Sequence, residues 1–349
     1  MSFLSDILFI LKRRDGYDPQ TDYTHSLSTG LSNSCSFIDT MLKNNNIISN
    51  IEIVVDNNDI DRVVTLHKPS TVIIEALWVT PEKFKVLTRL HPTIKWVVRL
   101  HSEIPFLANE GIALQWVNDY LAYPNVFVAA NSDIILEELQ HYVKSCKRGY
   151  TKKIIYLPNH YDLKEGNKYW YISNEYINIS CFGAIRPLKN HMIQAVAALK
   201  FVNKIGKKLR FHINSERTEM KGDSILKNLI SFFDGLEDQG HELISHEWKT
   251  YEEFLKLCRG VDIGMQCSFS ETFNIVAADH INMGVPVVVT DEIPWACSLF
   301  TANATNSNDI AKKLLRAYRY GKYNVYFNTK NIKKYNEESE DIWLRFMLT

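Results

Sequence analysis

Short hydrophobic runs alternate along the chain with longer segments in which hydrophobic residues recur at helical spacing. In the first half, each run is almost continuously apolar, which is typical of strands buried on both faces of a parallel sheet. The runs predict strands at residues 7–11, 51–55, 70–78, 95–101, 125–132 and 153–158. The segments between them predict helices at residues 32–45, 80–91, 109–123 and 133–146.

The alternation stops at residues 157–176, which are polar, aromatic and turn-prone, and then begins again. The second series predicts strands at residues 177–183, 208–214, 242–248, 261–268 and 286–290, and helices at residues 190–206, 224–236, 250–260, 274–284 and 308–321. We therefore expect an α/β protein with two Rossmann-like, doubly wound domains facing a central cleft. The expected domains are residues 1–160 and 161–325, with residues 326–349 as a tail helix that packs back on the first domain.

The charge balance of the chain favours no particular partner. The sequence has 349 residues, 46% of them hydrophobic, and its 40 Lys and Arg residues equal its 40 Asp and Glu residues. Overall charge therefore indicates neither nucleic acid nor an acidic membrane as a partner. Two basic segments with interleaved aromatic residues, 142–153 and 316–335, are compatible with binding along a phosphate backbone or with an ordinary solvated surface.

The cysteines indicate a reducing compartment. They are far apart, none forms a Cys-x-x-Cys pair, and several lie inside apolar runs, as expected of small buried hydrophobic residues. We therefore expect no disulfide, no zinc site and a cytoplasmic location. The apolar part of residues 1–18 is too short to span a membrane and lacks the flanks of a signal peptide, so we expect a first strand and no stable membrane insertion.

The stretch SFSETFNIVAADHINMGVPVVVTD, residues 268–291, carries the first candidate site. Glu271 follows a predicted strand and precedes a helix that begins near Asn274. The backbone N–H groups of Thr272, Phe273, Asn274 and Ile275 would then be available to bind phosphate.

A second acid, Asp279, lies about one turn further along that helix. Two carboxylates placed this way could accept hydrogen bonds from sugar and ribose hydroxyls on either side of a bound diphosphate. In the alternative interpretation, Glu271 caps the helix and Asp279 lies on a solvated face.

The stretch FGAIRPLKN, residues 182–190, carries the second candidate site. A predicted strand leads to Gly183 and a short loop with Arg186 and Lys189, and a helix begins near Asn190. Two cations beside a helix N-terminus form an anion site. They are also common as ordinary surface cations in a loop that enters a helix.

Together the two stretches resemble the retaining nucleotide-sugar glycosyltransferases of the GT-B fold, the glycogen-synthase and sucrose-synthase type. In that family a Gly, Arg and Lys loop binds the donor diphosphate, which Gly183, Arg186 and Lys189 match. A Glu-x7-Glu motif follows in the family, and this chain aligns with it through Ser268, Glu271, Phe273, Asp279, Gly284 and Pro286. The chain departs from the motif at Asp279, which replaces Glu, and at Thr272 and Asn274, which replace glycines.

The N-terminal half matches the family less specifically. His101 in RLHSE corresponds to a family histidine near the transferred sugar, although a lone histidine at a strand end is usually a structural hydrogen-bonding group. Gly30 lies where the family has a glycine-containing loop that faces the acceptor, and Ser102 and Glu103 adjoin His101. We expect these three residues, and the insert at residues 12–34, on the acceptor side.

The resemblance implies a hexosyl- or pentosyltransferase that retains the anomeric configuration and takes its sugar from a nucleotide-diphosphate sugar. It assigns catalytic roles to His101, Glu271, Arg186 and Lys189, and it requires neither a cofactor nor a metal ion. No Asp-x-Asp motif lies in a suitable loop.

The acceptor is inferred from a further resemblance, to glycosyltransferases encoded by large tailed bacteriophages, carried by the stretches KRRDGYDPQTDY and RLHSEIPFLANEG. It implies hydroxymethylated pyrimidines in duplex DNA as acceptors, and the host cytoplasm as the location. A cell-surface glycan, a lipid-linked sugar, a nucleotide-sugar epimerase and a non-catalytic DNA- or partner-binding protein are the alternatives. The sequence leaves the sugar, the nucleotide and the oligomeric state open.

Overall fold

The computed structural model describes residues 6–13, 29–146, 150–164 and 175–348. The chain divides into two compact units, each with its own parallel sheet. The first unit includes Thr29–Asp162 together with the first strand and the chain from Tyr335 onward, and the second includes Leu163–Lys334. The predicted connection at residues 157–176 lies partly outside the described residues, as does most of the insert at residues 12–34.

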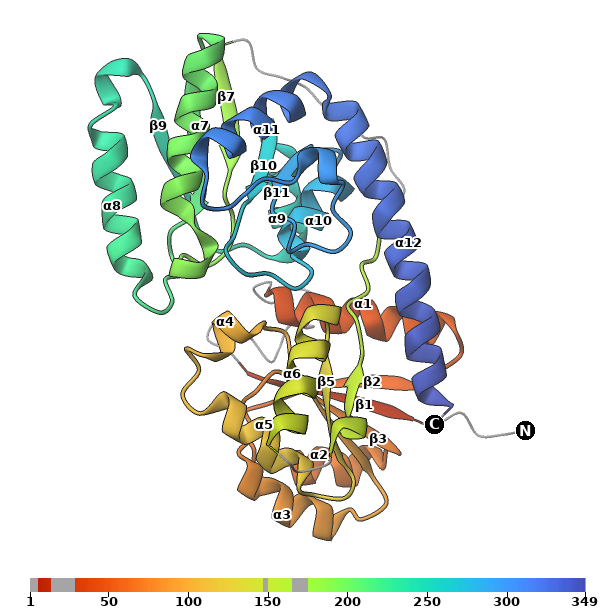
Figure 1. The fold of residues 1–349 in the computed structure, drawn as a ribbon. Helices are drawn as coiled ribbons and strands as arrows, with labels where there is room; N and C mark the ends of the chain where they lie inside the picture. The colour runs from red at the N-terminus through yellow and green to blue at the C-terminus, as the bar shows by residue number, and fades with distance from the viewer. Residues whose placement is uncertain (1–5, 14–28, 147–149, 165–174, 349) are drawn as a thin grey trace. The chain divides into compact units, whose positions relative to one another are not determined.

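The first unit contains a six-stranded sheet in the order β2-β1-β3-β4-β5-β6, and all its pairs are parallel (Figure 1). Its topological switch point lies between β1 and β3, because β2 is added on one side of β1 and the later strands on the other. The strands are β1 (Ile7–Lys12), β2 (Ser49–Val54), β3 (Thr71–Glu75), β4 (Lys95–Arg99), β5 (Val126–Ala130) and β6 (Ile154–Tyr156).

Helices cover both faces of this sheet. One face packs against α2, α3, α5 and α6 in a single hydrophobic core. The other packs against α1 and the end of α12, where Trp343 and Met347 join Cys35 and Ile38. The helices are α1 (Gly30–Asn44), α2 (Ile60–His67), α3 (Pro81–Leu90), α4 (Ile104–Leu107), α5 (Ala113–Leu121), α6 (Asp133–Ser145) and α12 (Gly321–Met347).

The second unit contains a five-stranded parallel sheet in the order β11-β10-β7-β8-β9. Its switch point lies between β7 and β10, since the chain moves outward from β7 to β9 and then returns to the other side of β7. The strands are β7 (Tyr176–Ser180), β8 (Lys208–Asn214), β9 (Glu242–His246), β10 (Ile263–Gln266) and β11 (Val287–Val289).

Two groups of helices enclose the second sheet. The larger core brings α7, α8 and α11 against it, and a smaller cluster holds α9 and α10. These helices are α7 (His191–Ile205), α8 (Gly222–Asp234), α9 (Tyr251–Arg259), α10 (Ile275–Asn282) and α11 (Ser307–Arg319). The long helix α12 begins directly after α11, and its residues up to Lys334 belong to the second unit.

The structure confirms the predicted α/β class, and each predicted strand is present, β8 with the predicted ends and the others with shifted ends. The sequence prediction missed α2, an eight-residue helix with no side-chain cap at its N-terminus, which is followed by Lys68 in a left-handed conformation. The prediction also placed the last helix in a tail at residues 326–349, whereas α12 begins at Gly321.

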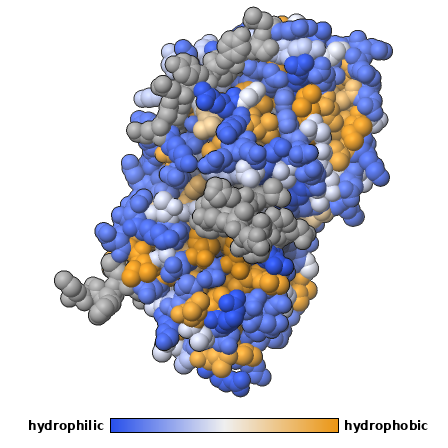
Figure 2. Space-filling model, turned by 180° about the vertical axis from the view of Figure 1, so that it is seen from behind, coloured by the Kyte–Doolittle hydropathy of each residue, from blue (hydrophilic) through white to orange (hydrophobic). Residues whose placement is uncertain are grey.

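Hydrophobic residues gather in patches on the face drawn in Figure 2, between larger hydrophilic areas. Within the described ranges, we find no helix that is long and apolar enough to cross a membrane.

Gly222 provides a test of the packing around the loop that follows β7. It is the first residue of α8, and an added Cβ would lie 2.0 Å from the carbonyl oxygen of Ile185. We expect Gly222→Ala to lower the free energy of unfolding by about 1–3 kcal/mol, because backbone must move to admit the methyl group. Urea unfolding followed by circular dichroism measures this change.

Gly235→Ala, at the other end of α8, is the matched control. The nearest atom to its added Cβ is 3.6 Å away, an ordinary contact distance. Equal stability of the two variants would contradict the close approach of Gly222 to Ile185.

Candidate functional site

The two sequence motifs meet at the switch point of the second sheet. Strands β7 and β10 are parallel neighbours, with Ile179 opposite Ile263 and Ser180 opposite Gly264. The loop after β7 contains Arg186 and Lys189, and the loop after β10 contains Glu271 and leads into α10. Because both strands run the same way, both loops leave from the same edge, which is where open α/β sheets bind ligands.

An ion pair joins the two loops. Lys189 Nζ donates a hydrogen bond to Glu271 Oε1, and the side chains of Lys189 and Glu271 are only 13% and 9% exposed. Burial acts to raise the pKa of Glu271, but the Lys189 ammonium and the Arg186 guanidinium overcome it and hold this pKa below its usual value. Glu271 is therefore a carboxylate at neutral pH.

Arg186 lies in a second ionic group beside this pair. Its Nη1 is 3.2 Å from Glu219 Oε2, and Arg217 Nε is 2.8 Å from the other oxygen of the same carboxylate. Burial, then the Lys189 and Arg186 cations, lowers the pKa of His191 to about 3. His191 is thus neutral at neutral pH, and its shifted pKa reflects the positive potential at the start of α7.

Further hydrogen bonds fix the two loops against each other. Asn190 has a left-handed backbone (φ 59°), and its Nδ2 donates to the carbonyl oxygen of Cys267 at 2.9 Å. Gln194 accepts from the N–H of Cys267 at 2.9 Å and donates to the carbonyl of Lys189 at 2.7 Å. The N–H of Phe269 donates to Leu188. The cationic loop and the acidic loop therefore form one unit.

Asn274 caps α10 and explains one departure from the family motif. It has φ 58°, a conformation that glycine adopts freely and that asparagine tolerates better than other residues. Its Oδ1 accepts from the N–H of Ala277 at 2.9 Å, and its Nδ2 donates to Gln266 Oε1 at 3.0 Å. Thr272 is not among the described residues with positive φ, so its position does not require glycine.

The remaining residues assigned to the donor side lie in different local surroundings. Phe273 is fully buried, with its ring 5.9 Å from that of Trp295, and Ile275 is the first residue of α10. Gly183 has φ 114°, and its N–H donates to Asn214 Oδ1 at 3.0 Å.

Asp279 is nearly inaccessible to solvent, and its Oδ1 accepts a hydrogen bond from the hydroxyl of Tyr251 at 3.0 Å. The alternative that Asp279 lies on a solvated face is therefore wrong. The side chain that caps α10 is that of Asn274, not Glu271. Sequence reasoning missed Tyr251, which no local pattern connects with Asp279.

In the first unit, a buried ionic group surrounds His101. Glu75 ends β3 and Arg99 ends β4, both are fully buried, and Arg99 Nη1 is 3.1 Å from Glu75 Oε2. Arg99 also donates to the carbonyl of Leu157 at 2.9 Å and to Asn159 Oδ1 at 2.6 Å.

His101 Nε2 contacts Glu75 Oε2, the same carboxylate oxygen that Arg99 approaches. Burial acts to raise the pKa of Glu75, but Arg99 and His101 overcome it and lower this pKa. The contact fixes the orientation of the imidazole ring, so any ligand contact of His101 must use the rest of the ring. The sequence analysis named His101 but missed Glu75 and Arg99, although an acid and a base at the ends of adjacent apolar strands were visible.

The residues assigned to the acceptor side have different surroundings within the first unit. Gly30 is exposed and begins α1 after the N-cap Thr29. Glu103 is buried and accepts from the hydroxyl of Ser132 at 2.7 Å, while Ser102 is partly exposed.

The six cysteines are free thiols, in agreement with the sequence prediction. Among the residues that the structure describes, no group of three or more His, Cys, Asp or Glu side chains could hold a metal ion.

No family model matches the sequence, and the search of curated proteins gave no match. Solved structures do match. An E. coli structure described as trehalose-6-phosphate bound with UDP-2-fluoro glucose is 11% identical over 98% of this chain and 99% of its own, with a TM-score of 0.69. Anabaena HepE, in complex with UDP and glucose, is 14% identical over 97% and 96%, with a TM-score of 0.61.

A UDP-forming trehalose-phosphate synthase from Burkholderia xenovorans is 12% identical, covers 84% of this chain and 77% of its own, and has a TM-score of 0.62. These proteins are glycosyltransferases of the GT-B fold. The comparison confirms the predicted GT-B fold class, because the similarity extends over both sheets.

The buried pair of Glu75 and Arg99 gives a stability prediction. We expect Glu75→Gln to lower the free energy of unfolding by about 3–5 kcal/mol, because it leaves the Arg99 charge buried without a counter-ion. The control is Asp341→Asn, whose carboxylate pairs with Arg345 at the exposed surface, with an expected loss below about 1 kcal/mol. If urea unfolding gave the two variants equal losses of unfolding free energy, burial of the Glu75–Arg99 pair would not explain its contribution to stability.

The second unit should be sensitive to mild acid. Burial is the largest cause that lowers the pKa of His191 to about 3 and those of His212 and His280 to about 4. An unfolded histidine binds its proton below about pH 6.5. Since the folded groups bind it only near pH 3–4, their stabilising contribution is complete above about pH 6.5 and is lost as pH falls below it.

Three such groups predict a loss of about 4 kcal/mol per pH unit near pH 5, and a smaller slope toward pH 6 and toward pH 4. His191→Met should reduce this slope by about one third, whereas replacement of the exposed His141 should leave it unchanged. Urea midpoints measured across this range test the expectation, and a flat profile in the wild type would contradict it.

Proposed function

We propose that the protein is a glycosyltransferase that takes a sugar from a UDP-sugar donor and transfers it to a hydroxyl acceptor. The observation that carries the proposal is the meeting of Arg186, Lys189, Glu271 and the N-terminus of α10 at the switch point between β7 and β10. A diphosphate is the ligand that two cations and a helix N-terminus bind best. UDP is the nucleotide named for the three similar glycosyltransferases.

In this proposal the donor site stabilises charge on the leaving group. As the bond between the sugar C1 and the phosphate oxygen breaks, negative charge grows on UDP, and Arg186, Lys189 and the first N–H groups of α10 lie where they can stabilise it. Glu271 binds hydroxyls of the transferred sugar, and Asp279, held by Tyr251, binds the ribose. In this proposal, Arg186, Lys189 and the N–H groups of α10 therefore stabilise the negative charge of the leaving UDP.

Transfer proceeds with retention in this proposal. The acceptor oxygen forms the new bond to C1 on the face that the diphosphate leaves, and its proton passes to the departing phosphate. His101, oriented by Glu75, contacts a hydroxyl of the sugar. Residues 1–160 provide the acceptor side and residues 161–325 hold the donor.

The proposed acceptor is a hydroxymethylated pyrimidine in DNA. The resemblance of the N-terminal stretches to bacteriophage enzymes supports it, together with the cations and aromatic residues of residues 316–335. The target base would have to leave the helical stack to react. A glycan or a lipid-linked sugar would be recognised by its own hydroxyls and is the alternative acceptor.

Donor binding tests the site directly. We expect UDP to bind the wild type in isothermal titration calorimetry, and Lys189→Met/Glu271→Gln to bind at least about ten-fold more weakly, since a charge-assisted contact contributes about 1.4 kcal/mol or more. The double change removes both members of the buried pair, so no isolated charge remains.

Lys200→Met is the control, because Lys200 lies in α7 but bonds to Ser307 and Asn308 at the surface. UDP binding that is equal in the double variant and the wild type would remove the basis of the proposal. The acceptor is tested separately, by incubation with UDP-glucose and either hydroxymethylcytosine DNA or an oligosaccharide, followed by mass spectrometry. A hexose found on the oligosaccharide alone would reject DNA as the acceptor.

A further inference from the structure

Charge is strongly segregated in one part of this neutral chain. Residues 310–335 contain eight cations and no Asp or Glu, although Lys and Arg balance Asp and Glu exactly over the whole sequence, 40 to 40. The segment covers most of α11 and the part of α12 that belongs to the second unit. The cations are Lys312, Lys313, Arg316, Arg319, Lys322, Lys330, Lys333 and Lys334.

The inner side of α12 is anchored to the second sheet. Asn324 forms two hydrogen bonds with the backbone of Val287 in β11, at 3.1 and 2.7 Å. Asn328 accepts from the N–H of Cys297 at 2.7 Å. These buried amides, together with Val325 on the same side, determine which side of the helix faces solvent.

Between Gly321 and Lys334, the exposed residues of α12 are only lysines and aromatic residues. Tyr323 and Tyr326 are each 62% exposed, and Phe327 is 38% exposed. At about 100° per residue these side chains and the lysines fall within an arc of about 140°. The exposed residues of this arc, which we call the Lys–Tyr face, are Lys322, Tyr323, Tyr326, Phe327, Lys330, Lys333 and Lys334.

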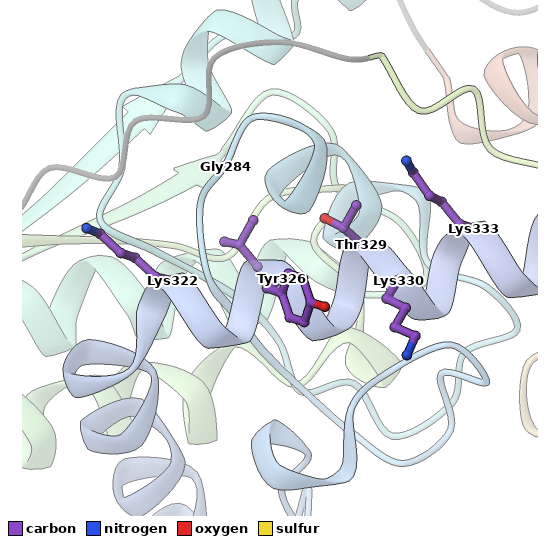
Figure 3. Close-up of a pocket in the computed structure, with 7 residues that line it drawn as sticks. Gly284, Lys322, Tyr326, Thr329, Lys330 and Lys333 are labelled. Carbon is purple, nitrogen blue, oxygen red and sulfur yellow. The ribbon is translucent and has the colours of Figure 1, made fainter.

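A hollow of about 560 Å³ lies beside this face, lined by residues that include Lys322, Tyr326 and Lys330. Figure 3 shows these three side chains following one another along α12. Successive members are four residues apart, so they lie about 6 Å apart along the helix axis. An aromatic ring thus lies between two cations, next to a space large enough for a base.

This arrangement matches the chemistry of a single-stranded nucleic acid. Its phosphates carry the charge opposite to that of the lysines, and residues 310–335 contain no Asp or Glu that would repel them. Its bases offer a flat surface to exposed tyrosines, whatever the sequence. A helix that binds a membrane instead presents a broad aliphatic face, and here the exposed arc has no aliphatic residue.

We propose that the Lys–Tyr face binds single-stranded or locally opened nucleic acid without sequence preference, through lysine contacts to phosphates and stacking of bases on Tyr323 and Tyr326. The role of this contact rests on the proposed function, because an acceptor base that leaves its stack opens the strand around it. The binding itself does not require transfer.

The salt dependence of binding tests the lysines. Fluorescence anisotropy with a labelled single-stranded DNA, repeated across salt concentrations, gives the affinity and its slope. We expect Lys322→Gln/Lys330→Gln to weaken binding and to reduce the slope of log affinity against log salt by about 1.4, since each lost phosphate contact accounts for about 0.7. The control is Lys227→Gln/Lys256→Gln, two exposed lysines of α8 and α9, which should change neither quantity.

Tyr326 tests stacking. Tyr326→Ala should weaken binding at least about five-fold with no change in the salt slope, and Tyr326→Phe should preserve the affinity. An affinity and slope for Lys322→Gln/Lys330→Gln that equal those of the wild type would overturn the proposal. Binding of vesicles of phosphatidylserine, but not of DNA, through the same lysines would also overturn it.

The donor-site variant separates this inference from the proposed function. Lys189→Met/Glu271→Gln should weaken UDP binding and leave DNA binding unchanged, whereas Lys322→Gln/Lys330→Gln should weaken DNA binding and leave UDP binding unchanged. Failure of UDP binding in the wild type would reject the donor site alone. Failure of wild-type DNA binding would reject the Lys–Tyr face alone.

Discussion

The ion pair between Lys189 and Glu271 is the contact on which the candidate site depends. Charges are costly to bury, so a nearly inaccessible pair persists only where the surrounding structure holds it in good geometry. Here β7 and β10 are neighbouring strands, and their pairing brings together two loops that are distant in the sequence. Asn190 and Gln194 then fix the loops against each other.

In the proposed function, the same pair limits which ligands the site can bind. Each cation already has a carboxylate partner, Lys189 with Glu271 and Arg186 with Glu219. A ligand has to offer at least as much negative charge as these carboxylates if it is to draw the cations toward itself. A diphosphate meets this requirement. Once it draws Lys189 away, the carboxylate of Glu271 can accept hydrogen bonds from sugar hydroxyls. A neutral ligand would leave the pair intact.

The sequence reveals the fold and the motifs better than the contacts between them. Apolar runs separated by helical segments indicate a parallel sheet because burial on both faces leaves that pattern in each strand. The cap at Asn274 was less visible, since a left-handed asparagine occupies a position where the family has glycine. The contacts of Glu75 with Arg99 and of Tyr251 with Asp279 join residues that are distant in the sequence, so a local pattern can show a charged residue at a strand end but not its partner.

The Lys–Tyr face shows why net charge is a poor guide to partners for a chain of this size. Attraction to a polyanion acts over about one Debye length, roughly 8–10 Å, so distant acids cannot cancel a local cluster of lysines. In α12 the anchoring amides of Asn324 and Asn328 keep the cations on the outer side rather than distributing them around the helix. The relevant quantity is therefore the charge of one helix face, and for this face it is entirely positive.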